Sequence, residues 1–414
     1  MRHEAPPSYD PRDAAQRANP WALYAAWRQH QPVAWVDAIG GWMLTRFDDC
    51  QQALSDPRLS NARIASYDAH LRSRGEQTGV LAASLQQWAV FNDPPRHTEL
   101  RLMVAKAFGA RSMERLRPQV GAIVESLIDG FIERGEADLV QDFAVPLPTR
   151  VIAHLLGVPP EDAPLLKQWS DELATFVGTS LTVADRRERA TAAVQEFRRY
   201  FAPLVARYRA EPADNLVSVV GQATIEGREV SEVEVADIAL SILFAGHETT
   251  THLIANGIRQ LVAHEGSVEA VATGQVAAEV AVEELLRFDG PVNGVARLVR
   301  ERYELRGAVL EPGQRLFCML GAANRDPERF DEPDTFRLAR GDTRHLAFGH
   351  GPHFCLGALL ARTEARLAIP ALCRRLTGLR VPLESNAWVD SLVLRGMSTL
   401  PATFEPGPRH RGDA

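Results

Sequence analysis

Residues 348–357 read Phe-Gly-His-Gly-Pro-His-Phe-Cys-Leu-Gly, and a helix is predicted to follow over residues 358–376. Three glycines around one cysteine indicate a backbone that turns sharply or passes very close to another group. Cys355 lies at the start of the predicted helix, where the helix dipole and free N–H groups favour a thiolate. A thiolate in this setting suits an axial iron ligand, because N–H groups directed at the sulfur tune its donation to the metal.

The composition is that of an ordinary globular protein. The chain has 414 residues, of which 46 are basic and 53 acidic, and its net charge is −7. The length alone suggests about two or three domains. The acidic balance argues against nucleic acid as a partner, since phosphate binding needs a dense basic face. The cysteines are few and form no C-x-x-C pair, which argues against disulfides and structural zinc.

The sequence predicts no membrane segment. Its longest strongly apolar stretch, residues 238–246, is far shorter than the ~20 residues that cross a bilayer. The first twenty residues lack the apolar core of a signal peptide, and we expect them to form an N-terminal arm over residues 1–20. A cytoplasmic protein is therefore expected.

Apolar residues at three- and four-residue spacing predict that the chain is mainly helical. Helices are expected over residues 20–30, 94–108, 113–134, 143–156, 165–177, 190–210 and 231–263. Short strands are expected over residues 33–36, 41–47, 295–299, 303–309, 315–320 and 392–404, the first two as a hairpin. Residues 58–91 show little period and are expected to be irregular. The predicted fold class is mainly α with a minor β region.

The cysteine stretch completes the pattern F-x-x-G-x-x-x-C-x-G with Phe348, Gly351, Cys355 and Gly357. On this pattern the sequence resembles the cytochrome P-450 family, the haem-thiolate monooxygenases, and in particular its soluble bacterial members. The resemblance implies the cytochrome P-450 fold in a single domain over residues 1–414. It also implies haem b, with Cys355 as the axial ligand of its iron.

Two upstream segments match the same family. Glu284-Leu-Leu-Arg287 fits the Glu-x-x-Arg pair that stabilises the proximal side of the core. The spacing alone is weak, because Glu114–Arg117 and Glu196–Arg199 share it, so position along the chain selects the pair. Ala245-Gly-His-Glu-Thr-Thr250 matches the oxygen-binding helix, which the resemblance implies is locally opened by a threonine hydroxyl.

The resemblance assigns roles to individual residues. Thr249 would organise the hydrogen bonds around dioxygen, and Glu248 would relay protons to it. The residues matching the family's positions for pairing with the haem propionates are His97, Arg101, Arg297 and His353. The residues expected to contact the haem elsewhere are Phe348, Gly349, Gly357 and Ala245.

The resemblance also implies a substrate pocket beside the haem. Its expected lining is Val90, Leu243, Ala245, Val292, Val295 and Met397. Because this lining is mostly apolar, a bulky apolar small molecule such as a terpenoid, steroid, fatty acid or macrolide is expected as substrate. Packing of the core is the alternative role for several of these residues.

No G-x-G-x-x-G stretch of a flavin- or nicotinamide-binding unit follows a predicted strand, so separate proteins are expected to deliver electrons. The resemblance implies a ferredoxin and a ferredoxin reductase, with NAD(P)H as ultimate electron source and dioxygen as cosubstrate of a monomeric enzyme. Arg111, Arg115 and Arg362 form a candidate basic face for an acidic redox partner. Three other functions stay open: a peroxygenase that uses hydrogen peroxide directly, a haem-binding sensor or transport protein, and a structural helical protein without haem.

His247-Glu248 also begins the zinc-protease motif H-E-x-x-H. The second histidine, His252, lies five positions after His247 instead of four. At ~100° per residue the two rings point ~140° apart around the helix, so they cannot share one metal ion. The sequence therefore excludes a zinc hydrolase built on these two histidines.

Overall fold

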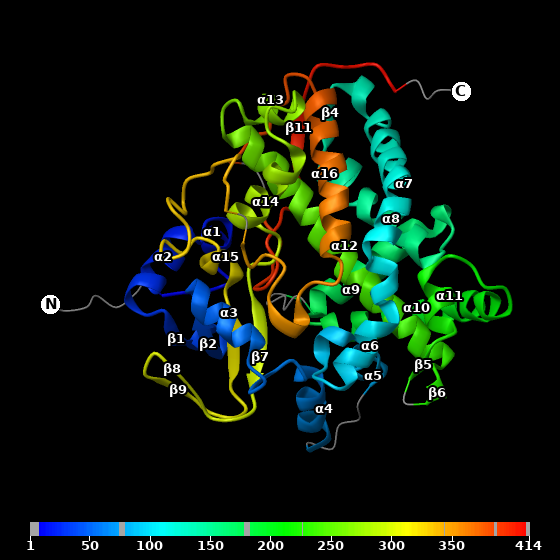
Figure 1. Ribbon diagram of the computed structural model, residues 1–414, viewed down its shortest axis with the longest axis vertical. Helices are drawn as coiled ribbons and strands as arrows, with labels where there is room; N and C mark the ends of the chain where they lie inside the picture. The colour runs from blue at the N-terminus through cyan, green and yellow to red at the C-terminus, as the bar shows by residue number, and fades with distance from the viewer. Residues whose placement is uncertain are drawn as a thin grey trace. The chain divides into compact units, whose positions relative to one another are not determined.

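The computed structural model describes residues 8–73, 79–177, 183–225, 227–342, 344–384 and 387–410. The chain divides into two compact units, and helices dominate both of them (Figure 1). Unit 1 contains Met1–Leu59, Leu116–Pro148 and Thr249–Ala414, and unit 2 contains Ser60–Arg115 and Thr149–Glu248. Three helices continue from one unit into the other, namely α7 (Ala110–Asp129), α8 (Pro146–Leu156) and α12 (Glu232–Ala263).

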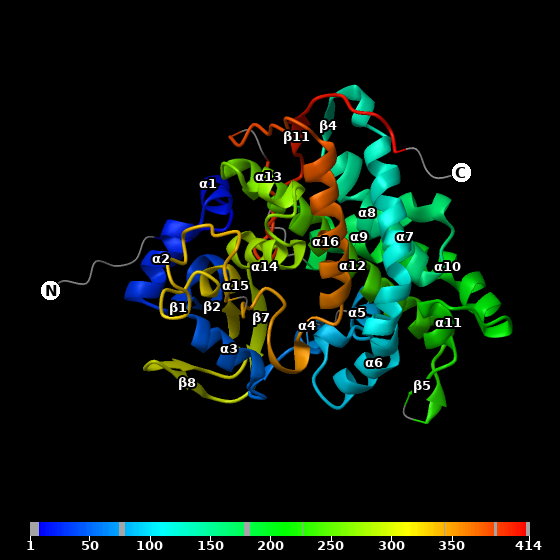
Figure 2. The same cartoon turned by 45° about the horizontal axis from the view of Figure 1, so that its top comes forward.

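Unit 1 combines helices with small sheets. Its other helices are α1 (Ala14–Ala18), α2 (Trp21–His30), α3 (Phe47–Ser55), α13 (Ser267–Ala272), α14 (Ala278–Asp289), α15 (Leu320–Ala323) and α16 (Ala358–Arg375). Its strands are β1 (Val33–Val36), β2 (Gly41–Leu44), β4 (Glu136–Asp138), β7 (Val295–Val299), β8 (Tyr303–Leu305), β9 (Ala308–Leu310), β10 (Arg315–Cys318) and β11 (Pro401–Thr403), with β3 (Leu59–Ser60) at its boundary. Helices α13 and α14 pack against α16, as Figures 1 and 2 show.

The largest sheet of unit 1 has the strand order β1-β2-β10-β7-β3. Strand β10 runs parallel to β2 and antiparallel to β7, so that Leu316 is the partner of both Trp42 and Arg297. Gly41 permits this pairing, because a Cβ atom there would lie 2.9 Å from the carbonyl oxygen of Arg315. The register fixes Arg297 on a strand that has neighbours on both sides.

Unit 2 consists of helices and one two-stranded hairpin. Its helices are α4 (Arg63–Ser73), α5 (Val80–Leu85), α6 (Arg96–Ala105), α9 (Ala163–Val177), α10 (Arg186–Ala210) and α11 (Leu216–Gly221), and its strands are β5 (Thr224–Ile225) and β6 (Arg228–Glu229). Asp237 of α12 is buried and accepts hydrogen bonds from Ser84 Oγ (2.8 Å) and Arg198 Nη2 (2.7 Å). These bonds join α5, α10 and α12.

Most of the predicted helices and the hairpin over residues 33–44 are present, so the predicted fold class is confirmed. The prediction of irregular structure over residues 58–91 was wrong, because α4 and α5 lie there. Helix α5 has only six residues, and one of the four that it buries is Ser84, so its apolar pattern is too short to reveal a helical period. Of residues 392–404, only β11 forms a strand within the described part of the chain.

The stretch expected to be an N-terminal arm contains a helix. Helix α1 follows Asp13, whose carboxylate accepts a hydrogen bond from the N–H group of Ala15 at 2.8 Å. Tyr9 is buried, with its ring 6.2 Å from that of Tyr24. A side-chain cap and a buried aromatic ring hold residues 8–20 in place. Residues 1–7 of the expected arm lie outside the described residues.

Helix α12 is an uninterrupted α-helix of 32 residues, so the local opening expected near Thr249 is not present. Close packing there comes instead from Gly246, where a Cβ atom would lie only 2.6 Å from Ile152 of α8. Thr251 donates its hydroxyl to the carbonyl of Ala144 at 3.0 Å. Neither α12 nor any other helix in the described ranges is long and apolar enough to span a membrane.

Glu364, on α16, is a completely buried carboxyl group. Neither of its carboxylate oxygens has a hydrogen-bond partner among the described residues. Burial raises the pKa of Glu364 well above its ordinary value, because the interior disfavours the charged form. The folded protein therefore holds a proton at this position over a pH range in which the unfolded chain has lost it.

Replacing Glu364 with glutamine is expected to make stability less dependent on pH. Because the parent must retain a proton to fold, its free energy of unfolding falls by about 1.4 kcal/mol per pH unit above the ordinary glutamate pKa. The E364Q variant carries no such proton, so its stability relative to the parent should rise over the pH range between the ordinary glutamate pKa and the raised pKa of the folded protein. Urea unfolding across this range measures the difference. A matched E311Q variant, which changes an exposed turn, should track the parent, and an E364Q curve parallel to the parent's would contradict a protonated Glu364.

Candidate functional site

Cys355 differs from the other three cysteines in its exposure. Cys50, Cys318 and Cys373 are buried, whereas Cys355 is half-buried. Burial raises the pKa of Cys373 to about 12, so that thiol stays protonated. Cys355 instead lies just before α16, where the N-terminal end of a helix favours a thiolate. Among the four thiols, Cys355 is the one suited to bind a metal ion.

The loop before Cys355 is closed by its own backbone. The N–H group of Cys355 donates to the carbonyl of Phe348 at 2.9 Å, and the N–H group of Phe354 donates to that of Gly351 at 3.0 Å. Gly349 and Gly351 have φ values of +72° and +71°, which side chains other than glycine rarely adopt. A Cβ atom on Gly351 would also lie 2.7 Å from Ser55 Oγ, so the loop packs directly on the end of α3. The sharp turn and close approach that the sequence predicts for this loop are therefore present, and they explain why glycine occupies these positions.

A buried ion pair supports the segment that leads into this loop. Arg287 donates from Nε and Nη2 to the two carboxylate oxygens of Glu284, at 2.7 and 2.9 Å. Its Nη1 donates to the carbonyls of Asn324 and Pro333, both at 2.9 Å. The side-chain oxygen of Asn324 accepts the N–H group of Leu346 at 2.7 Å, two residues before Phe348. The predicted pair therefore connects α14 to the chain that carries the cysteine.

Glu283 organises a second ion-pair network that the sequence did not reveal. It accepts hydrogen bonds from Arg362 at 2.6 and 2.7 Å, from Arg366 at 3.4 Å and from His345 at 3.2 Å. Burial alone would raise the pKa of Glu283, but the bonds from Arg362 and His345 outweigh burial and lower the pKa to about 2. The Arg362 guanidinium also lies 4.4 Å from the centre of the Phe348 ring. Glu283 therefore holds the Arg362 guanidinium against the ring of Phe348, the first residue of the cysteine pattern.

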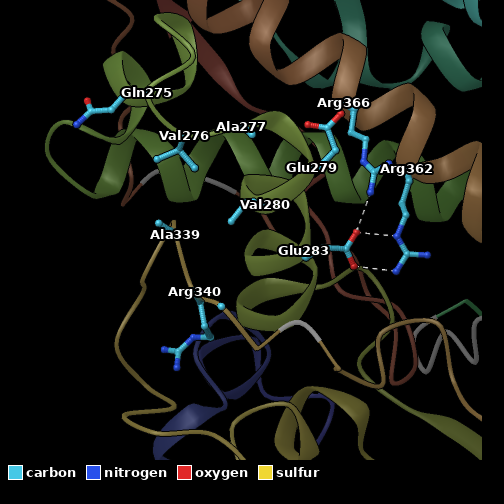
Figure 3. Close-up of a pocket in the computed structure, with 11 residues that line it drawn as sticks. Gln275, Val276, Ala277, Glu279, Val280, Glu283, Ala339, Arg340, Arg362 and Arg366 are labelled. Carbon is cyan, nitrogen blue, oxygen red and sulfur yellow. Dashed lines mark hydrogen bonds and ion pairs between the residues drawn. The ribbon is translucent and has the colours of Figure 1, made fainter.

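Figure 3 shows the bonds from Arg362 and Arg366 to Glu283 at a hollow of about 760 Å³, which is lined by residues 275–277 and 339–341 and by side chains of α14 and α16. Arg340, which also lines the hollow, donates to Glu284 and to three backbone carbonyls, so its hydrogen-bonding groups are occupied. None of the residues expected to contact substrate is among the described residues that line it. The hollow is therefore distinct from the predicted substrate pocket.

The remaining predicted residues of unit 1 lie on several elements. Arg297 is buried on β7 and donates to the carbonyl of Ala296 at 3.0 Å. His353 is half-buried and ends the 3-10 turn Gly351–His353, two residues before Cys355. Thr249, in the middle of α12, is half-buried. Of the predicted substrate contacts, Val292 and Val295 are half-buried and Met397 is fully buried. Gly357 directly precedes α16.

In unit 2, His97 and Arg101 lie one turn apart on α6, as the sequence predicts. Burial lowers the pKa of His97, and the nearby charge of Arg101 lowers it further. The two side chains are therefore close enough to interact.

The other predicted residues of unit 2 differ in exposure. Ala245 is exposed and Glu248 half-buried, both on α12, whereas Leu243 on the same helix is completely buried. Val90, just before α6 in the chain, is 48% exposed. Asp171 of α9 lies beside His247 and Glu248, and the sequence did not predict this neighbour. A contact between residues so far apart along the chain leaves no spacing pattern from which the sequence could predict it.

The residues present fit the haem that the resemblance implies. A haem-thiolate site needs a cysteine sulfur on a tightly folded loop and cations for two propionates. Unit 1 supplies Cys355 on a loop in which Gly351 leaves no room for a side chain, together with Arg297 and His353. The donor types of unit 1 therefore match the group, with a thiol for the iron and two cationic side chains for two propionates.

The chain is similar to known proteins over most of its length. Residues 278–388 match the family model described as Cytochrome P-450. The chain is 36% identical over 385 residues to Cytochrome P-450 107B1 of Saccharopolyspora erythraea, covering 91% of this chain and 93% of that protein. It is also 36% identical over 394 residues to the Vitamin D(3) 25-hydroxylase of Pseudonocardia autotrophica, covering 94% of each. The crystal structure of CalO2 superposes with a TM-score of 0.90 at 32% identity, covering 97% of this chain and 100% of CalO2. The chain therefore belongs to the bacterial members of the cytochrome P-450 family and is a monooxygenase, which is a class of oxidoreductase.

Proposed function

We propose that this chain hydroxylates or otherwise oxidises a bulky apolar small molecule, using haem b, dioxygen and two electrons from a ferredoxin and its reductase. The observation that carries the proposal is the Cys355 loop. Two glycines with positive φ and the bond from the Cys355 N–H group to Phe348 hold a half-buried thiol at the start of α16. A structural helical protein has no need of this sharply turned loop around a half-buried thiol.

Cys355 would provide the axial thiolate, and the bound haem would supply the oxygen-activating chemistry. Arg297 and His353 in unit 1 and His97 and Arg101 in unit 2 would pair with the propionates. Gly349 and Gly357 would allow close approach of the loop, and Phe348 would shield the sulfur. Shielding matters because a drier environment and fixed N–H groups tune how strongly the thiolate donates.

Glu248 and Thr249 would manage protons. They are consecutive residues of α12, and both are half-buried. A carboxyl group and a hydroxyl group can each accept a proton and donate one, so both residues are able to take part in moving protons from solvent to the reacting oxygen. This pair favours a monooxygenase over a peroxygenase, since hydrogen peroxide already carries the protons and electrons.

The substrate would be largely apolar. Val90, Ala245, Val292 and Val295 offer small or branched apolar surfaces that are at least partly exposed. Leu243 and Met397 are completely buried, so they would act by supporting this lining. A relative whose name gives vitamin D3 as its substrate shows that a related chain accepts a large apolar molecule. Terpenoids, steroids, fatty acids and macrolides are the classes to test.

The electron donor would bind near Cys355. Phe354, directly before the cysteine, is 42% exposed and offers an apolar contact. Arg362 and Arg115 already pair with Glu283 and Asp214, so Arg111 is the candidate basic residue whose charge is not reduced by a described ion pair. We propose that the enzyme acts in the cytoplasm as a monomer with a single functional domain over residues 1–414, without nucleic acid.

Reconstitution of the haem-loaded protein with a ferredoxin, its reductase and NADPH tests this proposal. Compounds from the four classes are first titrated while the absorption shift that follows loss of the iron's water ligand is recorded. Compounds that bind should then yield products with one added oxygen atom derived from ¹⁸O₂, and only when the electron donors are present. Equal turnover with hydrogen peroxide and no donor would favour the peroxygenase, and binding without turnover would favour the sensor or transport protein.

A further inference from the structure

Three potential metal ligands meet in unit 2. Asp171 of α9 and His247 and Glu248 of α12 each place one ligand atom within 4.8 Å of the other two. His247 Nδ1 lies 3.5 Å from Glu248 Oε1 and 3.3 Å from Ser170 Oγ. Neither the monooxygenase reaction nor the packing of α9 on α12 requires an imidazole between two carboxylates.

The sequence drew attention to His247-Glu248 as the start of a zinc motif and excluded His252 as its completion. The structure supplies a different third ligand, Asp171, from another helix. The His247 imidazole is 1% exposed, and its Nδ1 is the ring nitrogen that lies against Glu248. Buried imidazoles occur at metal sites, where one ring nitrogen binds the ion.

The Asp171 carboxylate already pairs with a cation. Lys167 Nζ lies 2.5 Å from Asp171 Oδ2, so an ammonium group already compensates this carboxylate. The Asp171 side chain is 45% exposed, which gives an ion from solvent a path to the buried imidazole.

We propose that Asp171, His247 and Glu248 form a zinc-binding site. One imidazole nitrogen and two carboxylate oxygens are a donor set that Zn²⁺ accepts, with water as a fourth ligand. Zinc would displace the Lys167 ammonium from Asp171. Its effect on activity rests on the proposed function, because an ion held by Glu248 would prevent that carboxylate from relaying protons.

Equilibrium dialysis of the full-length, haem-loaded protein against zinc chloride, after removal of metals with a chelator, tests the site. The parent should retain one zinc ion per chain, and the D171N and H247Q variants should lose it. The matched control is E172Q, which alters the next residue of α9, a carboxylate paired with Arg189 and outside the cluster. E172Q should bind zinc as the parent does.

Substitution of Lys167 separates a metal site from a merely structural cluster. Because the ammonium competes with zinc for Asp171, K167M should bind zinc about two- to fivefold more tightly. All variants are first checked for unchanged haem content. Zinc retention unaltered by both D171N and H247Q, or weaker binding by K167M, would overturn the proposal.

Zinc inhibition then tests the consequence for activity. Zinc should slow ferredoxin-driven product formation by the parent and by E172Q, with little effect on H247Q measured against its own zinc-free rate. Stoichiometric zinc without inhibition of the parent would support the site and contradict the role given to Glu248. Failure of the site and failure of the proposed function are thus distinguishable.

Discussion

Replacing Arg287 with alanine is expected to leave a chain that neither folds stably nor retains haem. The guanidinium is 1% exposed, and four of its hydrogen bonds go to Glu284, Asn324 and Pro333. Removing one partner of a buried ion pair costs about 3–5 kcal/mol, because the other charge is left uncompensated. A typical domain has only about 5–15 kcal/mol of stability in total. Urea unfolding of the purified variant, with its haem content, measures the loss.

Arg337 provides the matched control for this experiment. Its side chain is 41% exposed and pairs with Asp331 at 3.2 Å, while its backbone N–H group donates to Glu284 and would survive the substitution. The R337A variant should therefore lose less than about 1 kcal/mol. An R287A variant that unfolds within about 1 kcal/mol of the parent and binds haem normally would contradict the structural role of the pair.

Replacing Thr249 with alanine is expected to divert electrons from product to hydrogen peroxide. The substitution removes the hydroxyl next to Glu248 and with it one step of the proposed proton path. Loss of a positioned proton donor typically costs about 100-fold or more in the step it serves, so product formed per NADPH should fall at least tenfold. Oxygen consumption should continue. Parallel assays of oxygen, peroxide and product measure this ratio.

Two threonine variants sharpen the interpretation. Thr249→Ser keeps the hydroxyl and should restore most of the coupling. Thr251→Val removes a hydroxyl from the same helix, but one that donates to the carbonyl of Ala144, so it should cost about 1 kcal/mol of stability and leave the coupling unchanged. Fully coupled turnover by Thr249→Ala would remove this residue from the proton path.

The parts of the fold that could be predicted are those whose burial follows a pattern of apolar residues within one short stretch of sequence. Long amphipathic helices such as α7, α9 and α10 bury one stripe, and the apolar spacing reveals that stripe. Helix α5 could not be found in this way, since it has only six residues and one of its buried positions is Ser84, which donates to Asp237 far along the chain. Which residues of such a short helix are buried depends on partners that are distant in the sequence. A single sequence does not reveal those partners.

In the candidate site, too, features formed by neighbouring residues could be predicted, whereas contacts between residues distant in the sequence could not. The cysteine loop could be predicted because its glycines, its cysteine and the following helix are contiguous. The Glu284–Arg287 pair was selected only by its position relative to the cysteine, since the spacing itself recurs elsewhere in the chain. Glu283 and Asp171 were missed, because their partners Arg362 and His247 lie 79 and about 76 residues away, respectively.

The absorption spectrum of the carbon monoxide complex of the reduced protein tests the central claim most directly. If Cys355 provides a thiolate ligand to haem iron, the parent should show the long-wavelength Soret band of a thiolate-ligated haem. The C373A variant, which removes a buried thiol from α16, the helix that follows Cys355, should show the same band. The Cys355→Ser variant should lose the band while any haem it retains still binds carbon monoxide. A Cys355→Ser spectrum identical to that of the parent would show that another residue holds the iron.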